Sequence, residues 1–170
     1  MKEQNPSARM HRRTLYLCRA ALIAALYVAL TWVSSMLGLS SGVIQIRFSE
    51  MLCILPVFTS AAIPGLTLGC LCANLFTGAI WQDIVFGTLA TLLGAIGTYS
   101  LKSFKWLAPI PPVAANSVIV PLVLAYGYKF EGGLPYFMLT VFIGEIISVY
   151  LLGLLLRTAL SKRKNFFSEI

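Results

Sequence analysis

Six charged or amide side chains lie within or beside apolar stretches of this sequence, where such groups are rare. They are Arg47, Glu50, Asn74, Asp83, Asn116 and Glu145. A charged side chain at membrane depth costs about 2.5–3.5 kcal/mol on insertion scales, so each one points to a function. Carboxylates accept hydrogen bonds, a guanidinium donates them, and amides do both. Together these groups are suited to binding a small polar molecule.

Glu145 is the strongest candidate, because it lies midway along the apolar stretch 134–156. Contact with a ligand and a structural hydrogen bond to a neighbouring helix both explain a glutamate at this depth. Asn116 lies within the stretch 109–126 and leaves the same two alternatives open.

The other four candidates lie near predicted helix ends. Asn74 and Asp83 are open to a second interpretation as ordinary helix-end residues, since Asp before a helix is a good cap. Arg47 and Glu50 are three residues apart, so in a helix they would lie on one face and could pair with each other.

The elements that must position these residues are apolar stretches at 15–37, 46–59, 64–76, 84–101, 109–126 and 134–156. A transmembrane helix needs about 20 apolar residues. The second and third stretches are short, which indicates tilt or an irregular segment buried inside the protein. We therefore expect an all-α fold, a polytopic membrane bundle of six transmembrane helices.

Composition supports this class. The 170 residues are 58% hydrophobic and 11% charged, with a mean hydropathy of +0.84. A soluble core could not bury so much apolar surface. The net charge of +7 would fit nucleic-acid binding, but the basic residues flank apolar runs, as in membrane proteins. A signal peptide is not expected, because the first apolar stretch is too long.

The basic residues also predict the orientation. Placing both termini in the cytoplasm puts 11 of the 13 Lys and Arg residues inside and leaves Arg47 and Lys129 outside. We expect a basic cytoplasmic N-terminal tail (1–13), a six-helix membrane domain (14–157) and a basic cytoplasmic C-terminal tail (158–170). The predicted location is the bacterial plasma membrane.

No motif for catalysis is present: the sequence lacks a dinucleotide-binding glycine motif, Walker A, HExxH and a Ser/His/Asp set. The only histidine, His11, lies in the basic tail. We interpret the cysteines as small buried hydrophobes: Cys18, Cys53, Cys70 and Cys72. We predict no catalytic residue, cofactor or metal, so energy for uphill transport must come from another protein. An intramembrane enzyme would need a nucleophile or metal ligands at depth, and a scaffold would not explain the polar set.

Small residues recur at helix-packing intervals. In the first apolar stretch they are Ala20, Ala21, Ala24, Ala25 and Ala29, which pack either inside the bundle or against a partner helix. Glycines at similar spacings predict close helix contacts at Gly65, Gly69, Gly87, Gly94 and Gly97.

With the N-terminus inside, the six polar residues fall from the outer face to about mid-membrane, and we expect them to line one cavity open to the outside. Three carboxylates against one guanidinium give a negative site, which suits a cationic or donor-rich ligand. An anion such as biotin would need more than one buried cation.

At these residues the sequence resembles the queuosine-precursor transporter family, the membrane S-components of energy-coupling-factor transporters. The resemblance lies in the segments 44–50 (IQIRFSE), 55–56, 63–65, 69–74, 83–88, 108–116 and 144–145. It implies a six-helix protein that captures a 7-deazaguanine such as preQ1, preQ0 or queuine at the outer side. It also implies docking through the alanine face onto a transmembrane coupling subunit (EcfT), with two cytoplasmic ATPases (EcfA and EcfA') driving the cycle.

Ligand chemistry suggests roles for five of the six polar residues. A deazaguanine presents N1–H beside a 2-amino group, which the Glu145 carboxylate could accept together, with Asn116 binding the carbonyl and ring edge. The aminomethyl cation of preQ1 could pair with Asp83 or Glu50, and Arg47 would hold Glu50 in place. The same machine with another vitamin-like substrate, such as biotin, is the nearest alternative.

Overall fold

The computed structural model describes residues 6–39, 45–129 and 132–162, and the regular elements in these ranges are helices. The chain begins with the 31-residue helix α1 (Pro6–Met36) and continues into a 3-10 helix, η1 (Phe48–Val57). Helices α2 (Ala62–Phe76) and α3 (Trp81–Ser100) follow.

The second half of the chain forms two long rods, each containing a π-helical segment. In the first, α4 (Ile110–Leu122) runs on as η2 (Val123–Gly127). In the second, α5 (Leu134–Glu145), η3 (Ile146–Leu152) and α6 (Gly153–Ser161) follow one another without a break. π-Helical turns often occur at functional sites.

In the described part of the chain, four helical segments are long and apolar enough to cross a membrane: Arg9–Met36, Trp81–Ser100, Ile110–Gly127 and Leu134–Ser161. The predicted all-helical, polytopic bundle is therefore confirmed. The two short predicted spans correspond to η1 and α2, with 10 and 15 residues. At about 2.0 and 1.5 Å per residue, both would extend roughly 20 Å, less than the ~30 Å hydrocarbon core.

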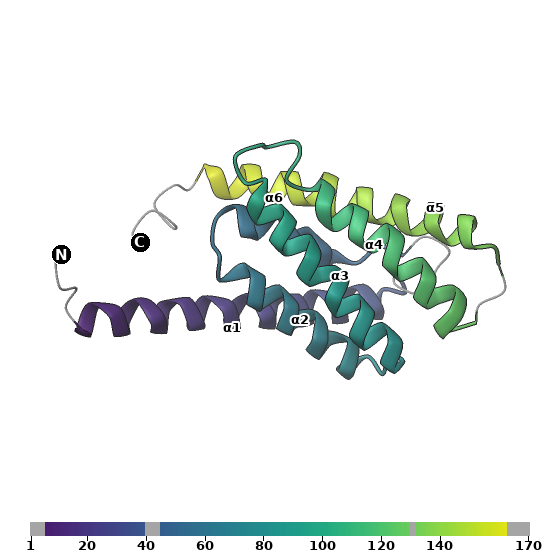
Figure 1. Cartoon of the computed structure of the whole chain (residues 1–170), viewed down its shortest axis with the longest axis horizontal. Coiled ribbons are helices and arrows are strands. Elements are labelled where there is room, and N and C mark those ends of the chain that lie inside the picture. The colour runs from purple at the N-terminus through teal and green to yellow at the C-terminus, as the bar shows by residue number, and fades with distance from the viewer. Residues whose placement is uncertain (1–5, 40–44, 130–131, 163–170) are drawn as a thin grey trace.

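The helices pack in chain order around η1. Helix α1 lies beside α2, α2 beside α3, α3 beside α4, and α4 beside α5, while η1 contacts α1, α3, η3 and α6 (Figure 1). The side chains of Cys53 and Ile54 on η1 are fully buried. An irregular segment is tolerated at this depth because protein, rather than lipid, surrounds it.

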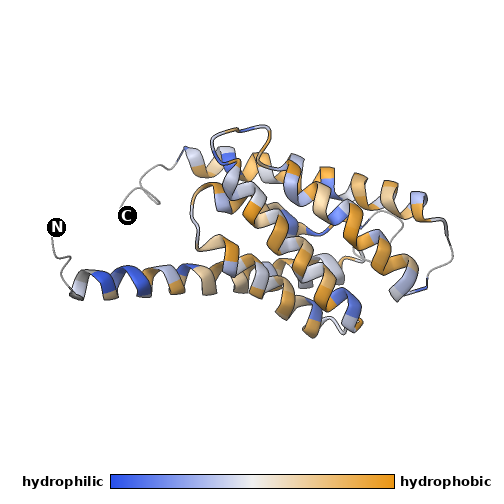
Figure 2. Cartoon of the chain, viewed as in Figure 1, coloured by the Kyte–Doolittle hydropathy of each residue, from blue (hydrophilic) through white to orange (hydrophobic). Residues whose placement is uncertain are grey.

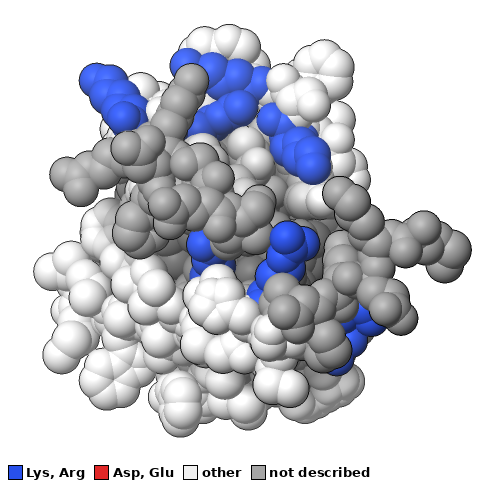
Figure 3. Space-filling view, turned by 90° about the vertical axis from the view of Figure 1, so that its left-hand side faces the viewer, with Lys and Arg blue, Asp and Glu red and all other residues white. Residues whose placement is uncertain are grey.

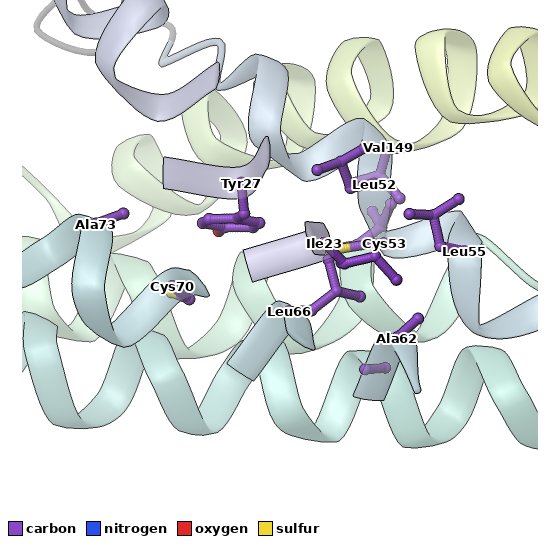
Figure 4. Close-up of a cluster of buried hydrophobic side chains, with 12 residues drawn as sticks. Ile23, Tyr27, Leu52, Cys53, Leu55, Ala62, Leu66, Cys70, Ala73 and Val149 are labelled. Carbon is purple, nitrogen blue, oxygen red and sulfur yellow. The ribbon is translucent and has the colours of Figure 1, made fainter. Parts of the chain in front are cut away.

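The largest apolar core cluster joins α1, η1 and α2, with residues such as Ile23, Leu52 and Leu66 (Figure 4). Glycines bring α1 and α2 together here, as predicted. A Cβ atom on Gly65 would lie 2.8 Å from the carbonyl oxygen of Ala20, and one on Gly69 would lie 2.7 Å from the Cβ of Tyr27. The two helices can approach this closely only while both positions remain glycine.

A second close contact joins α3 and α4. A Cβ atom on Gly94 would lie 2.7 Å from the Cα of Pro112, and one on Gly97 would lie 2.4 Å from the Cβ of Pro111. The prolines stand in the first turn of α4, where the missing N–H removes no helix hydrogen bond.

Apolar residues cover most of the bundle, whereas the first turns of α1 are hydrophilic (Figure 2). Helix α1 begins at Pro6, so part of the predicted N-terminal tail is helical and projects beyond the bundle (Figure 1). Figure 3 shows this end of the molecule, where Lys and Arg gather and no acidic residue is visible. The start of α1, the α3–α4 loop and the end of α6 all lie toward this end.

Candidate ligand-binding site

A small cavity with several polar lining residues lies among η1, α2, α3, α4 and α5. It is lined by Gln45, Arg47, Glu50, Cys70, Gly87, Thr91, Asn116, Val120, Val141 and Glu145. Its volume is about 20 Å³, room for about one water molecule. A bicyclic heterocycle is far larger, so it fits only after the lining residues move apart.

Glu50 is the most extensively hydrogen-bonded group at this cavity. Its side chain is 3% exposed, and Tyr27 of α1 donates its hydroxyl to Oε1. Oε2 accepts from the Cys53 thiol at 3.2 Å and from Asn116 Nδ2 at 3.4 Å. The 3-10 geometry explains the Cys53 contact, because residues three apart in such a helix lie on the same face. Glu50 is thus a fixed acceptor held by three elements.

Arg47 lines the same cavity but stands just before η1, in extended backbone with φ −110° and ψ 111°. The helical spacing that would pair it with Glu50 therefore does not apply. In the described part of the chain, the donors to Glu50 are Tyr27, Cys53 and Asn116 instead. Arg47 lies within electrostatic range of Asp83 and Glu50.

Glu145 lines the cavity from the last residue of α5. It is 8% exposed, and within the described ranges its Oε2 atom has no hydrogen-bond partner. Asn116 lies close to this carboxylate as well as to Glu50. A buried acceptor without a donor costs about 1–3 kcal/mol, and more when it is charged. The free oxygen therefore marks the position where a ligand donor would be most favourable.

The segment that leads into η1 passes so close to α5 that the residue before Glu145 must be a glycine. A Cβ atom on Gly144 would lie 2.1 Å from the carbonyl oxygen of Gln45. Any larger residue would push Gln45 away from α5. Because Gln45 and Arg47 both line the cavity, this contact also shapes the site.

Asn74 and Asp83 form a separate polar cluster next to the cavity. Asn74 Nδ2 donates to the backbone oxygen of Asp83 at 3.2 Å, and Asp83 Oδ2 accepts from the Tyr128 hydroxyl at 3.2 Å. The same hydroxyl accepts from the backbone N–H of Ile80 at 3.4 Å. Gly87 lies between the two clusters, since its Cβ would be 3.2 Å from both Asn74 Nδ2 and Asp83 Oδ1.

The structure therefore brings four of the six predicted residues onto one cavity, namely Arg47, Glu50, Asn116 and Glu145. Asn74 and Asp83 stand behind its wall. The sequence interpretation missed Tyr27, Cys53 and Tyr128 as members of the polar networks. A hydroxyl at depth was the available signal for Tyr27, but its partner on η1 depends on how the helices pack.

The alanine face divides into two parts. Ala20 is buried and Ala24 partly buried against Gly65 and Gly69, so they belong to the interior packing of α1 and α2. Ala21, Ala25 and Ala29 are exposed. Among the described residues, no group of three or more His, Cys, Asp or Glu side chains is placed to hold a metal ion.

Long apolar helices that surround a small polar site define a multi-pass helical membrane protein. A family model described as QueT transporter matches residues 17–162, and the chain belongs to this transporter family. It is 30% identical to the queuosine precursor transporter QueT of Lactococcus lactis subsp. cremoris (strain MG1363), over 89% of this chain and 95% of the relative. No solved structure shows significant similarity to the chain. Membership of a transporter family supports a function other than catalysis.

Proposed function

We propose that this protein is the substrate-binding membrane subunit, or S-component, of an energy-coupling-factor importer, and that it captures a queuosine precursor. The observation that carries the proposal is the Oε2 atom of Glu145, which lies at this cavity and has no hydrogen-bond partner among the described residues. The name of the Lactococcus relative supports the substrate class.

The charges at the cavity favour a donor-rich or cationic ligand. Among the described lining residues, two carry carboxyl groups, Glu50 and Glu145, and Arg47 is the one cation. A 7-deazaguanine offers N1–H and a 2-amino group, which the Glu145 carboxylate accepts in bidentate fashion. Asn116, between the two carboxylates, binds the carbonyl edge. The cation of preQ1 adds a pairing with the negative site.

The orientation follows from the basic end of the molecule. The positive-inside rule places the start of α1, the α3–α4 loop and the end of α6 in the cytoplasm. Asp83, in the first turn of α3, then stands on the outer side, close to the cavity. The substrate therefore enters from outside the cell.

Docking onto the coupling subunit uses the exposed part of the alanine face, Ala21, Ala25 and Ala29. Ala25 and Ala29 line a shallow apolar groove between α1 and α2, together with Trp32 and Phe76. Small side chains there let a partner helix approach closely in lipid. EcfT provides that helix, and the two ATPases EcfA and EcfA' supply the energy.

The decisive experiment is a binding screen of the purified protein against preQ1, preQ0, queuine, guanine and biotin. We expect deazaguanines to bind, and Glu145→Gln to weaken the binding by about 3 kcal/mol, roughly 100-fold or more, because charge-assisted hydrogen bonds are lost. Thermal unfolding of the variant provides the control for folding.

A ligand variant makes this test specific. Removing the 2-amino group from the deazaguanine should weaken binding to the wild type but have little further effect in Glu145→Gln. Equal losses in both proteins would remove Glu145 from the recognition of that group. Tight binding of biotin in place of the deazaguanines would overturn the proposed substrate class.

A further inference from the structure

The two carboxylates at the cavity have unequal surroundings. Glu50 receives hydrogen bonds from Tyr27, Cys53 and Asn116, so both of its oxygens have donors. Glu145 has an oxygen with no donor, although it is almost as deeply buried. Hydrogen bonds to a carboxylate stabilise its ionised form, whereas burial without them favours the neutral acid.

Charge balance points the same way. The titratable and charged groups that face the pair or Arg47 are Tyr27 from α1, Arg47 and Cys53 at η1, Cys70 from α2 and Asp83 from α3. Helix α4 contributes only the amide of Asn116, and α5 only Glu145 itself. Arg47 is the one cation in this described set, against the carboxyl groups of Glu50, Asp83 and Glu145.

Two neighbouring carboxylates in a buried site resist being ionised together. One proton on the pair lowers the excess negative charge, and it belongs on Glu145, whose Oε2 atom has no donor among the described residues. We propose that Glu145 carries this proton in the vacant site and that ligand binding releases it.

This inference rests on the proposed function, because the ligand supplies the replacement donors. In the exchange, the O–H bond of Glu145 breaks and its proton passes to solvent. The freed carboxylate accepts N1–H and the 2-amino group of the ligand. Tyr27 is then a positioning residue: its hydroxyl holds the negative charge on Glu50 and so keeps the proton on Glu145.

Infrared spectroscopy of the vacant protein tests the first half without any ligand. We expect a C=O stretch from a protonated carboxylic acid that disappears in Glu145→Gln and persists in Asp83→Asn. Addition of preQ1 should remove the band from the wild type. A vacant protein whose band is missing, or is lost in Asp83→Asn instead, would overturn the assignment of the proton to Glu145.

Calorimetry of preQ1 binding in two buffers with different ionisation enthalpies tests the second half. We expect about one proton to be released per ligand bound. In the pH range where Glu145 is protonated in the ligand-free protein, the affinity should fall about tenfold for each unit by which the pH is lowered. In Tyr27→Phe, Glu50 should share the proton, so the number released should fall below one. Cys53→Ala, which removes another donor, provides the same test if Tyr27→Phe does not fold.

The two proposals fail in different ways. A protein that binds preQ1 without releasing a proton keeps the proposed function and refutes the proton exchange. A protein that binds no deazaguanine refutes the substrate class and the exchange with it. Weaker binding in Tyr27→Phe with the full proton count would show that Tyr27 supports the fold without setting the charge.

Discussion

Glu50 and Glu145 face the same small cavity, yet their hydrogen bonding differs. Glu50 is held by donors from α1, η1 and α4, and Glu145 keeps a free oxygen. This arrangement is suited to ligand recognition. The donors of the protein already satisfy Glu50, so the ligand needs to supply donors only to Glu145. The cavity is too small for the ligand as it stands, so binding must include movement of its walls.

Gly144 provides a prediction for a single residue. Gly144→Ala places a methyl group against the carbonyl oxygen of Gln45, where the distance to a Cβ would be 2.1 Å. Overpacking of this kind typically costs about 1–3 kcal/mol. We expect a lower Tm in detergent and weaker binding of preQ1, since Gln45 lines the cavity.

The matched control lies on the same rod. A Cβ atom on Gly153 would meet the oxygen of Met51 at 3.5 Å, an ordinary contact. Gly153→Ala should leave the Tm unchanged or raise it, because alanine is the better helix former by about 1 kcal/mol. Equal stability of the two variants would contradict the tight contact at Gly144.

Helix α1 has two functional faces. One packs against α2 through Ala20 and Ala24 and reaches Glu50 through Tyr27. The same helix also holds the segment leading into η1, since the backbone N–H of Phe48 donates to Ser34 Oγ at 2.8 Å. The other face exposes small residues to lipid or to a partner. One helix thus connects the proposed docking surface with the binding site.

Two adjacent alanines separate these faces. Ala24→Leu should lower the Tm by disturbing the contact with Gly69, whose Cβ position lies 3.1 Å from the Cα of Ala24. Ala25→Leu should leave the Tm and preQ1 binding intact but prevent co-purification with the coupling subunit. Leu151→Trp, at an exposed site on the last span, should retain co-purification. Normal complex formation by Ala25→Leu would refute the docking surface.

The whole molecule carries its charges unevenly, with the basic residues gathered at one end. Its basic end is formed by elements far apart in the sequence (Figures 1 and 3). The cavity with its carboxylates lies among η1, α2, α3, α4 and α5. Trp106 is exposed at this end, and Nζ of Lys105 lies 5.0 Å from the centre of its ring. Such a pair is suited to the membrane–water interface.

Cysteine labelling in cells tests the orientation. In a background with Cys18 and Cys72 replaced by serine, Ser103→Cys lies in the α3–α4 loop and Gly133→Cys before α5. A membrane-impermeant maleimide should label Gly133→Cys in intact cells and Ser103→Cys only after lysis. The reverse pattern would place the basic end outside.

Much of the site was predictable because each buried charge is costly wherever the chain goes. That local cost was enough to single out Glu145, Asn116, Glu50 and Arg47, which do meet at one cavity. The partners of Glu50 were not predictable, since Tyr27 and Asn116 reach it only through the packing of three helices. The positions of Asn74 and Asp83 were not predictable either. Asn74 donates to the backbone oxygen of Asp83, Asp83 accepts from Tyr128, and neither side chain lines the cavity.

The sequence by itself determined that this is a helical membrane protein, because the transfer of apolar stretches into lipid depends on their length and composition and not on their neighbours. It also determined that basic residues flank the apolar stretches. Only the tertiary structure decided which face of the alanine-rich α1 is buried, that η1 is a short 3-10 helix inside the bundle, and which carboxylate keeps an oxygen without a donor among the described residues. Those outcomes depend on helix rotation and close contacts between segments distant in the chain, which no local pattern of residues records.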